Sequence, residues 1–275
     1  MAQKAGALLA DEMGLGKSVQ ALAALPSGAA TLVVAPAVAK GVWMREVRKW
    51  RPHLRVNVLS GKNSFRWPTK NEVVVVNYDV LPDVHTKACL IRRKSKALVI
   101  GQHTADCLKA KSNVYVPAVA EMANKCKGCL PESEVAKECK GCLPFLDDVP
   151  ENMVLVADEA HALKNSKAQR SVKFRGLSEA VRHKGGRVWL LTATPLINRP
   201  TELWSVFASA QIAQEAFGSF KQFVKLFDGK PSTFGGYSFG NPDTDAIAER
   251  LQRVMLRRLR EEVMPELPAK TIQET

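Results

Sequence analysis

The stretch Asp11-Glu12-Met13-Gly14-Leu15-Gly16-Lys17-Ser18 decides the fold of this chain. It stands between an apolar run, residues 7–10, and a helical pattern that begins at Val19. Gly14 and Gly16 let the backbone wrap closely around an anion, so that amide groups and a helix N-terminus face it. Lys17 is placed to reach the terminal phosphates of a nucleotide, and the Ser18 hydroxyl to coordinate magnesium. The whole stretch is therefore predicted to bind ATP with Mg²⁺.

A second acidic stretch, Asp158-Glu159-Ala160-His161, ends another apolar run at residues 153–157. This places both carboxylates at the C-terminal edge of a strand, where open α/β sheets bind their ligands. Asp158 suits magnesium, and Glu159 suits the water that attacks phosphorus. The first stretch departs from the usual phosphate-loop pattern in one respect, because Asp11 stands where a glycine is expected.

Short, nearly continuous apolar runs recur at residues 31–35, 73–76, 153–157 and 188–191. Strands with one polar face would alternate instead, so these runs indicate parallel strands buried on both faces. Helical stretches lie between them: Trp43, Val47 and Trp50 share one apolar helix face, and Pro200 is suited to open a helix. The alternation predicts an α/β fold, a doubly wound parallel sheet of the RecA-like, P-loop NTPase type.

The C-terminal part of the chain has a different composition. Residues 228–245 are rich in turn formers and are predicted to form a loop. A helix is predicted to follow, from about residue 244 to about residue 264. The periodicity fits an ordinary C-terminal helix and a helical extension of the domain equally well.

The net formal charge is +13, from 40 basic and 27 acidic residues. Solubility alone could account for this excess, but a polyanion partner fits better, because neutralising phosphates releases counterions. No run of about 18 uncharged apolar residues occurs, so no membrane span is expected. The first 25 residues lack a secretory signal pattern. We expect a soluble, intracellular protein of the cytoplasm, nucleoid or nucleus.

Two cysteine knuckles, Cys126-Lys127-Gly128-Cys129 and Cys139-Lys140-Gly141-Cys142, repeat one short motif. Four thiolates at this spacing suit tetrahedral zinc, which would help an insertion with few large apolar residues to fold. Redox-active or disulfide-bonded cysteines, or unliganded thiols in a loop, are the alternatives. Cys126, Cys129, Cys139 and Cys142 are therefore the predicted Zn²⁺ ligands.

Residues 11–18 resemble motif I of the Swi/Snf-type DNA-dependent ATPases, a branch of helicase superfamily two that carries Asp at the first position. Other segments follow in that family's order. They are residues 33–36 with Trp43, Glu46 and Trp50 (motif Ia), 76–79 (motif Ib), 158–161 with 163–165 (motif II), 191–196 with Asn198, Pro200, Glu202 and Leu203 (motif III), and 255–258 with 267–270, which close the first lobe. The step from Arg199 to Pro200 and the ending at residues 267–270 resemble the annealing-helicase subgroup most closely.

The resemblance implies a role for each matching residue. His161 would join Lys17, Asp158 and Glu159 in the catalytic set. His161, Thr192 and Thr194 would couple ATP to bound nucleic acid, and Pro36, Ala37, Asn77 and Tyr78 would lie on the DNA-facing rim. That rim would track phosphates without reading sequence.

The resemblance also implies a domain plan. Residues 1–83 and 151–210 would form the N-terminal RecA-like lobe, residues 84–150 the cysteine-rich insertion, and residues 211–275 a helical protrusion and linker. Only 17 residues follow Arg258, so we expect a second RecA-like lobe to come from a partner or a longer parent chain. Without its arginine finger the isolated chain is expected to bind ATP weakly and to hydrolyse it poorly.

Three functions fit these patterns. The favoured one is the motor lobe of a DNA-dependent ATPase that translocates on, remodels or reanneals duplex DNA. The others are an ATP-gated DNA-binding module without turnover, and the motor lobe of another superfamily-two enzyme, such as a restriction-system motor or an RNA helicase. The Met-Leu-Arg-Arg segment at residues 255–258 favours the first over the third.

Overall fold

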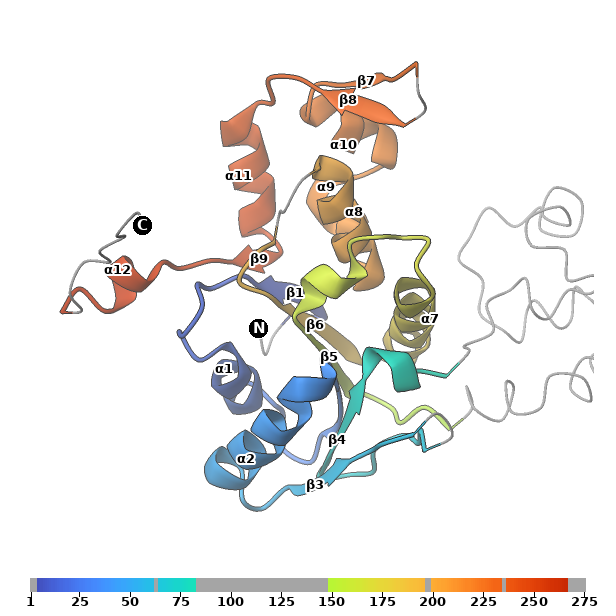
Figure 1. The fold of residues 1–275 in the computed structure, drawn as a ribbon, viewed down its shortest axis with the longest axis vertical. Helices are drawn as coiled ribbons and strands as arrows, with labels where there is room; N and C mark the ends of the chain where they lie inside the picture. Colours follow the sequence, from blue (N-terminus) through green and yellow to red (C-terminus); the bar gives the residue numbers. More distant parts are fainter. Residues whose placement is uncertain (1–3, 62–63, 83–147, 196–198, 234–235, 267–275) are drawn as a thin grey trace, which may run out of the picture.

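The computed structural model of the chain describes residues 4–61, 64–82, 148–195, 199–233 and 236–266. Its main sheet has seven parallel strands in the order β3-β4-β2-β5-β6-β1-β9 (Figure 1). The strands are β1 (Gly6–Leu9), β2 (Ala30–Ala35), β3 (Arg55–Val58), β4 (Glu72–Asn77), β5 (Val154–Asp158), β6 (Arg187–Leu191) and β9 (Met255–Leu256). The predicted parallel sheet is confirmed.

Helices connect and cover these strands. They are α1 (Lys17–Ala23), α2 (Lys40–Trp50), α7 (Gln169–His183), α8 (Pro200–Ser209), α9 (Ala213–Phe217), α10 (Phe220–Leu226), α11 (Thr244–Gln252) and α12 (Arg260–Val263). Short 3-10 turns follow three strands: η1 (Ala37–Ala39), η2 (Tyr78–Val80) and η3 (Ala160–Leu163). Pro200 occupies the first turn of α8, where its missing amide proton costs nothing.

The inner strands of the sheet are buried on both faces, as the continuous apolar runs predict. Along β2, Leu32 and Val34 belong to one core layer, and Val33 and Ala35 belong to the other. The helices divide in the same way, with Phe174, Leu177 and Phe207 of α7 and α8 in the first layer, and Leu22, Trp43 and Val47 of α1 and α2 in the second. This is a doubly wound arrangement.

The C-terminal part differs from its prediction in two places. The predicted helix ends at Gln252, because the chain beyond it turns to join the open edge of β1: Leu8 N donates to the carbonyl of Val254 (2.8 Å), and Ala10 N to that of Leu256 (2.7 Å). The predicted loop holds an antiparallel hairpin of β7 (Gly229–Pro231) and β8 (Tyr237–Phe239). Residues 211–275 therefore supply one strand of the main sheet as well as helices.

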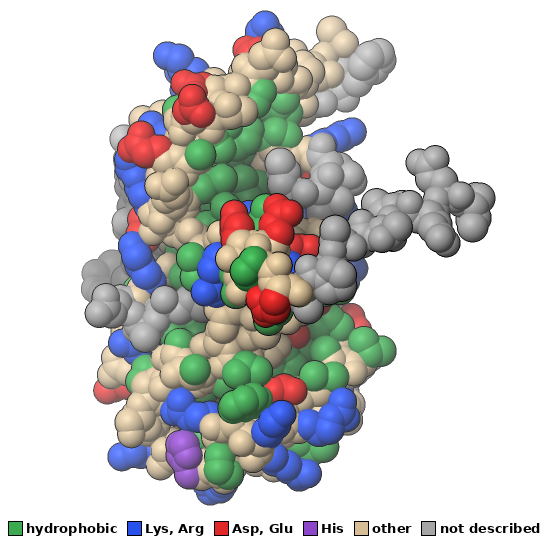
Figure 2. Space-filling model, turned by 90° about the vertical axis from the view of Figure 1, so that its left-hand side faces the viewer, with side chains coloured by type: hydrophobic (Ala, Val, Ile, Leu, Met, Phe, Trp, Pro, Cys, Tyr) green, Lys and Arg blue, Asp and Glu red, His purple; other side chains and the backbone are tan. Residues whose placement is uncertain are grey.

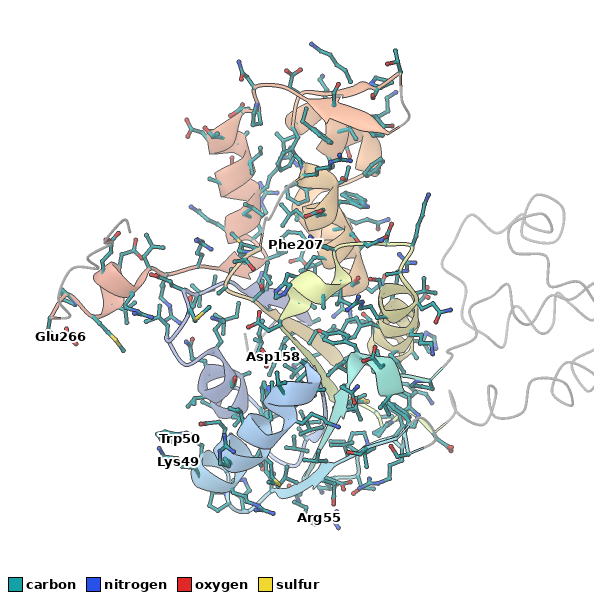
Figure 3. All side chains as sticks on the ribbon, in the orientation of Figure 1. Lys49, Trp50, Arg55, Asp158, Phe207 and Glu266 are labelled. Carbon is teal, nitrogen blue, oxygen red and sulfur yellow. The ribbon has the colours of Figure 1, made fainter. Side chains whose placement is uncertain are left out.

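The apolar face predicted for α2 is only partly correct. Trp43 and Val47 are buried, but Trp50 ends the helix and is 50% exposed. Its indole Nε1 donates to Glu46 Oε2 (2.8 Å), and the Lys49 Nζ lies 5.0 Å from the ring centroid (Figure 3). Trp50 is therefore a surface residue and contributes little to the core.

The cysteine knuckles lie outside the described residues. Within the described ranges, His, Cys, Asp and Glu side chains form no group of three or more that could hold a metal ion. The described helices include none with the length and apolar character needed to cross a membrane.

Candidate functional site

The glycine-containing stretch forms the loop between β1 and α1. Gly14 (φ 91°) and Gly16 (φ 69°) adopt left-handed conformations that disfavour residues with a Cβ. Gly16 caps α1, whose first turn has neither an acidic residue nor a side-chain cap. The amide groups at the start of α1 are thus left for another acceptor, and the helix dipole favours an anion there.

Lys17 is folded over the backbone of this loop. Its Nζ donates to the carbonyl oxygens of Asp11 (2.9 Å) and Glu12 (3.2 Å). These are neutral acceptors, so a phosphate group is a stronger partner for the ammonium. Ser18 lies one residue further along the first turn of α1 and is partly exposed. The loop is therefore suited to bind an anion between Lys17 and the helix N-terminus.

Asp11 is completely buried, and its carboxylate is directed to the C-terminal part of the chain. Its Oδ1 accepts from the backbone N (3.1 Å) and the Nε (3.2 Å) of Arg258, and its Oδ2 accepts from Gln20 Nε2 (2.9 Å). Arg258 Nη2 also bonds both Asp11 and Gln20. Burial alone would raise the pKa of the Asp11 carboxyl, but the hydrogen bonds from Arg258 and Gln20 and the Arg258 charge lower it.

Asp11 was predicted to bind the cofactor with the rest of the loop, yet its carboxylate is already engaged. Only its carbonyl faces Lys17. The aspartate that replaces the usual glycine therefore anchors the loop to Arg258. Sequence reasoning missed this pair, although both residues lie in segments that carry the family resemblance.

Asp158 lies at the end of β5, near the centre of the molecule (Figure 3). Its Oδ2 accepts from the indole Nε1 of Trp43 (2.7 Å), and its Oδ1 accepts from the backbone N of Glu159 (3.0 Å). The residue is partly exposed, so a cation can approach it. Trp43 was predicted to lie on the apolar face of a helix and to belong to motif Ia; from α2 it also fixes the direction of this carboxylate.

Glu159, His161 and Thr192 form a chain of contacts across the ends of β5 and β6. Glu159 has a left-handed backbone (φ 50°, ψ 51°), which is strained for a residue with a Cβ and common at functional sites. Its Oε2 lies 3.1 Å from His161 Nδ1, and this nitrogen lies 3.4 Å from Thr192 Oγ1. Thr192 Oγ1 in turn accepts from the backbone N of Thr194 (3.2 Å). The two predicted motifs are thus in contact.

The predicted rim residues follow β2 and β4. Ala37 is exposed and Pro36 is partly exposed. Asn77 is partly exposed, and its Oδ1 accepts from Lys40 Nζ (3.4 Å). These three residues lie at the surface, at the same sheet edge as the loop.

The prediction that Tyr78 lies on an exposed rim is wrong. The residue is only 5% exposed, and its hydroxyl donates to the carbonyl oxygen of Asp158 (2.8 Å). Burial, followed by the charges of Asp158 and Glu159, raises the pKa of Tyr78 well above its ordinary value. Tyr78 can therefore influence a ligand only through the acidic strand end that it supports.

The strand order brings the separate stretches together. β1 lies beside β6 and β6 beside β5, with Leu9 opposite Leu191 and Leu191 opposite Asp158. Thr192 N donates to the carbonyl of Leu9 (3.1 Å), which joins the start of the loop to the third motif. The loop, the acidic strand end and Thr192 thus share one edge of the sheet, where ligands of doubly wound sheets bind.

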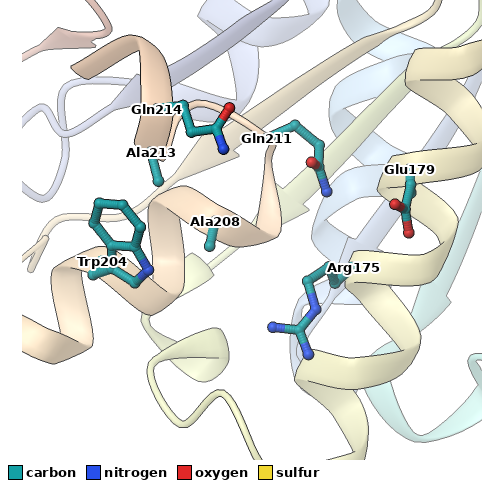
Figure 4. A pocket seen from close by; sticks show the side chains of 7 residues that line it. All are labelled: Arg175, Glu179, Trp204, Ala208, Gln211, Ala213 and Gln214. Atoms are coloured by element: carbon teal, nitrogen blue, oxygen red, sulfur yellow. The ribbon is translucent and has the colours of Figure 1, made fainter. Parts of the chain in front are cut away.

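A pocket of about 310 Å³ lies elsewhere, between α7, α8 and α9 (Figure 4). Arg175 and Glu179 line it from α7, and Trp204 and Ala208 from α8, with Gln211, Ala213 and Gln214 at the turn into α9. It contains none of the predicted site residues.

The loop and the strand end fit a nucleoside triphosphate with magnesium. The loop offers open amide groups and a lysine, and Asp158 offers a partly exposed carboxylate held by Trp43. This combination on a doubly wound parallel sheet defines a P-loop NTPase lobe of the RecA-like type. Over residues 1–275 the chain matches the SNF2-related domain. The chain belongs to this family.

Known relatives agree with this assignment. The chain is 28% identical over 268 residues to the Caenorhabditis elegans SWI/SNF-related matrix-associated actin-dependent regulator of chromatin subfamily A-like protein 1 homolog, covering 96% of this chain and 30% of the relative. It is 25% identical over 277 residues to the human DNA annealing helicase and endonuclease ZRANB3, covering 97% of this chain and 20% of the relative. The chain thus spans a third or less of these relatives. The predicted resemblance to the annealing-helicase subgroup is confirmed.

A solved structure supports the fold. The Sulfolobus solfataricus SWI2/SNF2 ATPase core domain aligns with a TM-score of 0.52 at 20% identity, covering 96% of this chain and 41% of that one. The RecA-like assignment made from the alternation of strands and helices is confirmed.

Proposed function

We propose that the chain is the ATP-binding motor lobe of a DNA-dependent ATPase, which couples ATP hydrolysis to translocation on, or remodelling or reannealing of, duplex DNA. The observation that carries this proposal is the shared sheet edge, where the loop of Lys17 and the acidic end of β5 lie on the two sides of the end of β6. Membership of the SNF2-related family supports it.

In this proposal each residue of the edge has a task. The loop amides and Lys17 bind the phosphates, Ser18 and Asp158 would hold Mg²⁺, and Glu159 orients the attacking water. Magnesium, when bound, neutralises phosphate charge. Trp43 keeps the Asp158 carboxylate in one orientation, so the carboxylate need not reorganise when a cation arrives.

His161 and Thr192 are proposed to carry the coupling between ATP and DNA. Their contacts run from Glu159, through the His161 ring, to the strand end of β6. A change at Thr194 can therefore alter the position of Glu159. This gives the predicted coupling residues a physical connection to the water-orienting carboxylate.

Duplex DNA is the proposed polyanion partner. The net charge of +13 supports it. Figure 2 shows basic side chains gathered at the lower end of the molecule, where α2 and β3 lie, and Arg45, Arg48, Lys49 and Arg55 are exposed there. Contacts of this kind are with phosphates and carry no sequence preference.

A second RecA-like lobe is proposed to complete the motor. The relatives that the chain matches are much longer than the matched region, which supports this. An arginine finger from such a lobe typically contributes about 10³ to 10⁵ in rate. We therefore expect slow turnover from the 275-residue chain alone.

We also propose that Cys126, Cys129, Cys139 and Cys142 bind one Zn²⁺, which rests on their spacing alone. Elemental analysis of the purified chain should find about one zinc per chain, lost on Cys126→Ser with Cys139→Ser. A metal-free wild-type chain that remains folded would contradict this.

The test of the proposed function measures ATP binding and ATP hydrolysis by the chain, with and without duplex DNA. Lys17→Ala should abolish ATP binding, and Glu159→Gln should keep binding but abolish turnover. Lys230→Ala, an exposed lysine on the β7–β8 hairpin, is the matched control and should change neither. Binding unaffected by Lys17→Ala would refute the site. DNA-stimulated turnover on the order of tens per second would refute the need for a second lobe.

A further inference from the structure

The chain that follows α11 runs beside β1 and is hydrogen-bonded to the phosphate loop, residues 11–18. We call residues 254–260 the β9 segment. Its backbone extends the sheet beside β1, and the carbonyl of Arg258 accepts from the backbone N of Glu12 (3.0 Å). The backbone N of Arg260 donates to Glu12 Oε2 (2.7 Å), and Arg260 Nη2 donates to the carbonyl of Met13 (2.5 Å). Three consecutive loop residues, 11–13, are thus bound by two arginines of this segment.

The position of Arg260 brings it close to the glycine turn. A Cβ built on Gly14 would lie 2.8 Å from Arg260 Nη2. The guanidinium of Arg258 bonds the buried carboxylate of Asp11 and the side chain of Gln20. The side chain of Arg258 is 39% exposed, whereas that of Asp11 is fully buried.

The formal charges decide what this contact does. Without the β9 segment, the loop holds the two carboxylates of Asp11 and Glu12 against the single ammonium of Lys17. The segment adds the guanidiniums of Arg258 and Arg260, and also that of Arg257, whose Nη1 donates to the carbonyl of Ala10 (3.3 Å). With the segment in place, four positive charges therefore stand against two negative ones. An anion-binding loop with an uncompensated buried carboxylate would repel a triphosphate, because charges in a partly buried site are weakly screened.

We propose that Arg258 and Arg260 are positioning residues for ATP, so that the phosphate loop binds ATP only while the β9 segment is docked on it. The inference rests on the proposed function, since it concerns the same loop. The two arginines act through Asp11, Glu12 and Met13 and need not touch the nucleotide. By reciprocity, bound ATP must favour the docked segment by the same factor, which for coupled sites is typically about 5- to 150-fold.

The first measurement is hydrogen exchange of the wild-type chain. Amides of residues 254–263 should exchange about tenfold more slowly with saturating magnesium and a non-hydrolysable ATP analogue than without them. The backbone amides of α11 serve as an internal reference, because their exchange should not change. Unchanged exchange in residues 254–263, with the analogue bound, would overturn the inference and leave the proposed function standing.

The second measurement compares three variants by titration with the same analogue. Arg258→Gln leaves the Asp11 carboxylate uncompensated and should weaken binding about tenfold or more. Arg253→Gln removes the same charge five residues earlier, where Arg253 is exposed and pairs with Glu249, and should not change binding. The pair Asp11→Asn with Arg258→Gln removes both charges and should restore most of the binding.

The paired variant separates charge from structure, because it keeps the substitution at position 258 but removes the buried charge. It also keeps the test available if Arg258→Gln does not fold. In this variant the slowing of exchange at residues 254–263 should be largely lost, although the analogue binds. Binding by Arg258→Gln equal to the wild type, or a paired variant as weak as the single one, would overturn the proposal. A wild-type chain that binds no nucleotide would overturn the proposed function and this inference together.

Discussion

Glu72 offers the sharpest test of the physical reasoning, because it is a buried carboxylate whose contribution to stability depends on pH. It is the first residue of β4, and its side chain is 4% exposed. Its oxygens accept from Arg66 Nη1 (3.0 Å), from Asn57 Nδ2 (2.6 Å), and from the backbone N and hydroxyl of Thr69 (both 2.8 Å). The hydrogen bond from Arg66, opposed by burial and aided by Thr69 and Asn57, lowers the pKa of Glu72 to about 2.

The magnitude follows from that pKa. Against the ordinary value of 4.5, a folded-state pKa of about 2 corresponds to on the order of 3 kcal/mol in favour of the ionised, folded state. Because the folded value lies below the unfolded one, this stabilisation is complete above about pH 4.5 and is lost as the pH falls toward about 2. By about pH 3, roughly 2 kcal/mol of it should be gone.

The variant Glu72→Gln tests this in urea unfolding at about pH 7 and about pH 3. Near neutral pH we expect a loss of roughly 2 to 3 kcal/mol in the free energy of unfolding, and a difference from the wild type that narrows by about 2 kcal/mol at the lower pH. Glu151→Gln, at an exposed glutamate, should change stability by less than about 0.5 kcal/mol at either pH. A loss of unfolding free energy of equal size at both pH values would refute the reasoning. Packing around Glu72, and not the ionisation of its carboxyl, would then be the source of the stability.

Three further predictions concern the site and the sheet. Trp43→Phe removes the donor to Asp158 and should lower magnesium-dependent ATP hydrolysis by about 10- to 100-fold, since a hydrogen bond to a charged group is worth about 1.5–3 kcal/mol; an unchanged magnesium dependence would contradict this. Thr192→Val keeps the buried volume but removes the oxygen beside His161, and it should reduce stimulation by duplex DNA by about tenfold while ATP binding stays intact; equal losses with and without DNA would argue against coupling. Gly186→Ala places a Cβ 2.7 and 2.8 Å from two backbone carbonyl oxygens, and should lower the free energy of unfolding by roughly 1 to 3 kcal/mol or more; a melting temperature equal to that of the wild type would show that the backbone yields there.

The buried strands were predictable because a strand covered on both faces has a continuous apolar sequence. The runs at residues 31–35, 73–76 and 188–191 all became strands of the main sheet. β3 escaped notice because it is the edge strand, and its residues Arg55 and Asn57 are exposed and polar. α7 also escaped, although Phe174, Leu177 and Val181 share its buried face. These three residues have helical spacing, but the charged residues between them made the pattern hard to recognise.

The site was predictable in its residues but not in their contacts. Gly14 and Gly16 predict the loop, because its backbone needs left-handed conformations that glycine adopts most readily. The partners of Asp11 and Asp158 could not be derived from local pattern, since Arg258 is 247 residues away from the first and Trp43 is 115 away from the second. The error at Tyr78 has the same origin: its burial depends on how η2 packs against the end of β5.

The place of β1 in the sheet has a consequence for synthesis of the protein. β1 precedes every other strand of the described chain, yet the strands beside it in the sheet, β6 and β9, follow it by well over a hundred residues. Gly6 pairs with Val188, so at about 5–20 residues per second roughly 10 to 40 seconds pass before that partner has been made. During this time an apolar strand and the glycine loop behind it have no sheet position to occupy. The phosphate loop is thus synthesised well before the strands that complete its side of the sheet, which makes this part of the nascent chain a natural target for chaperones.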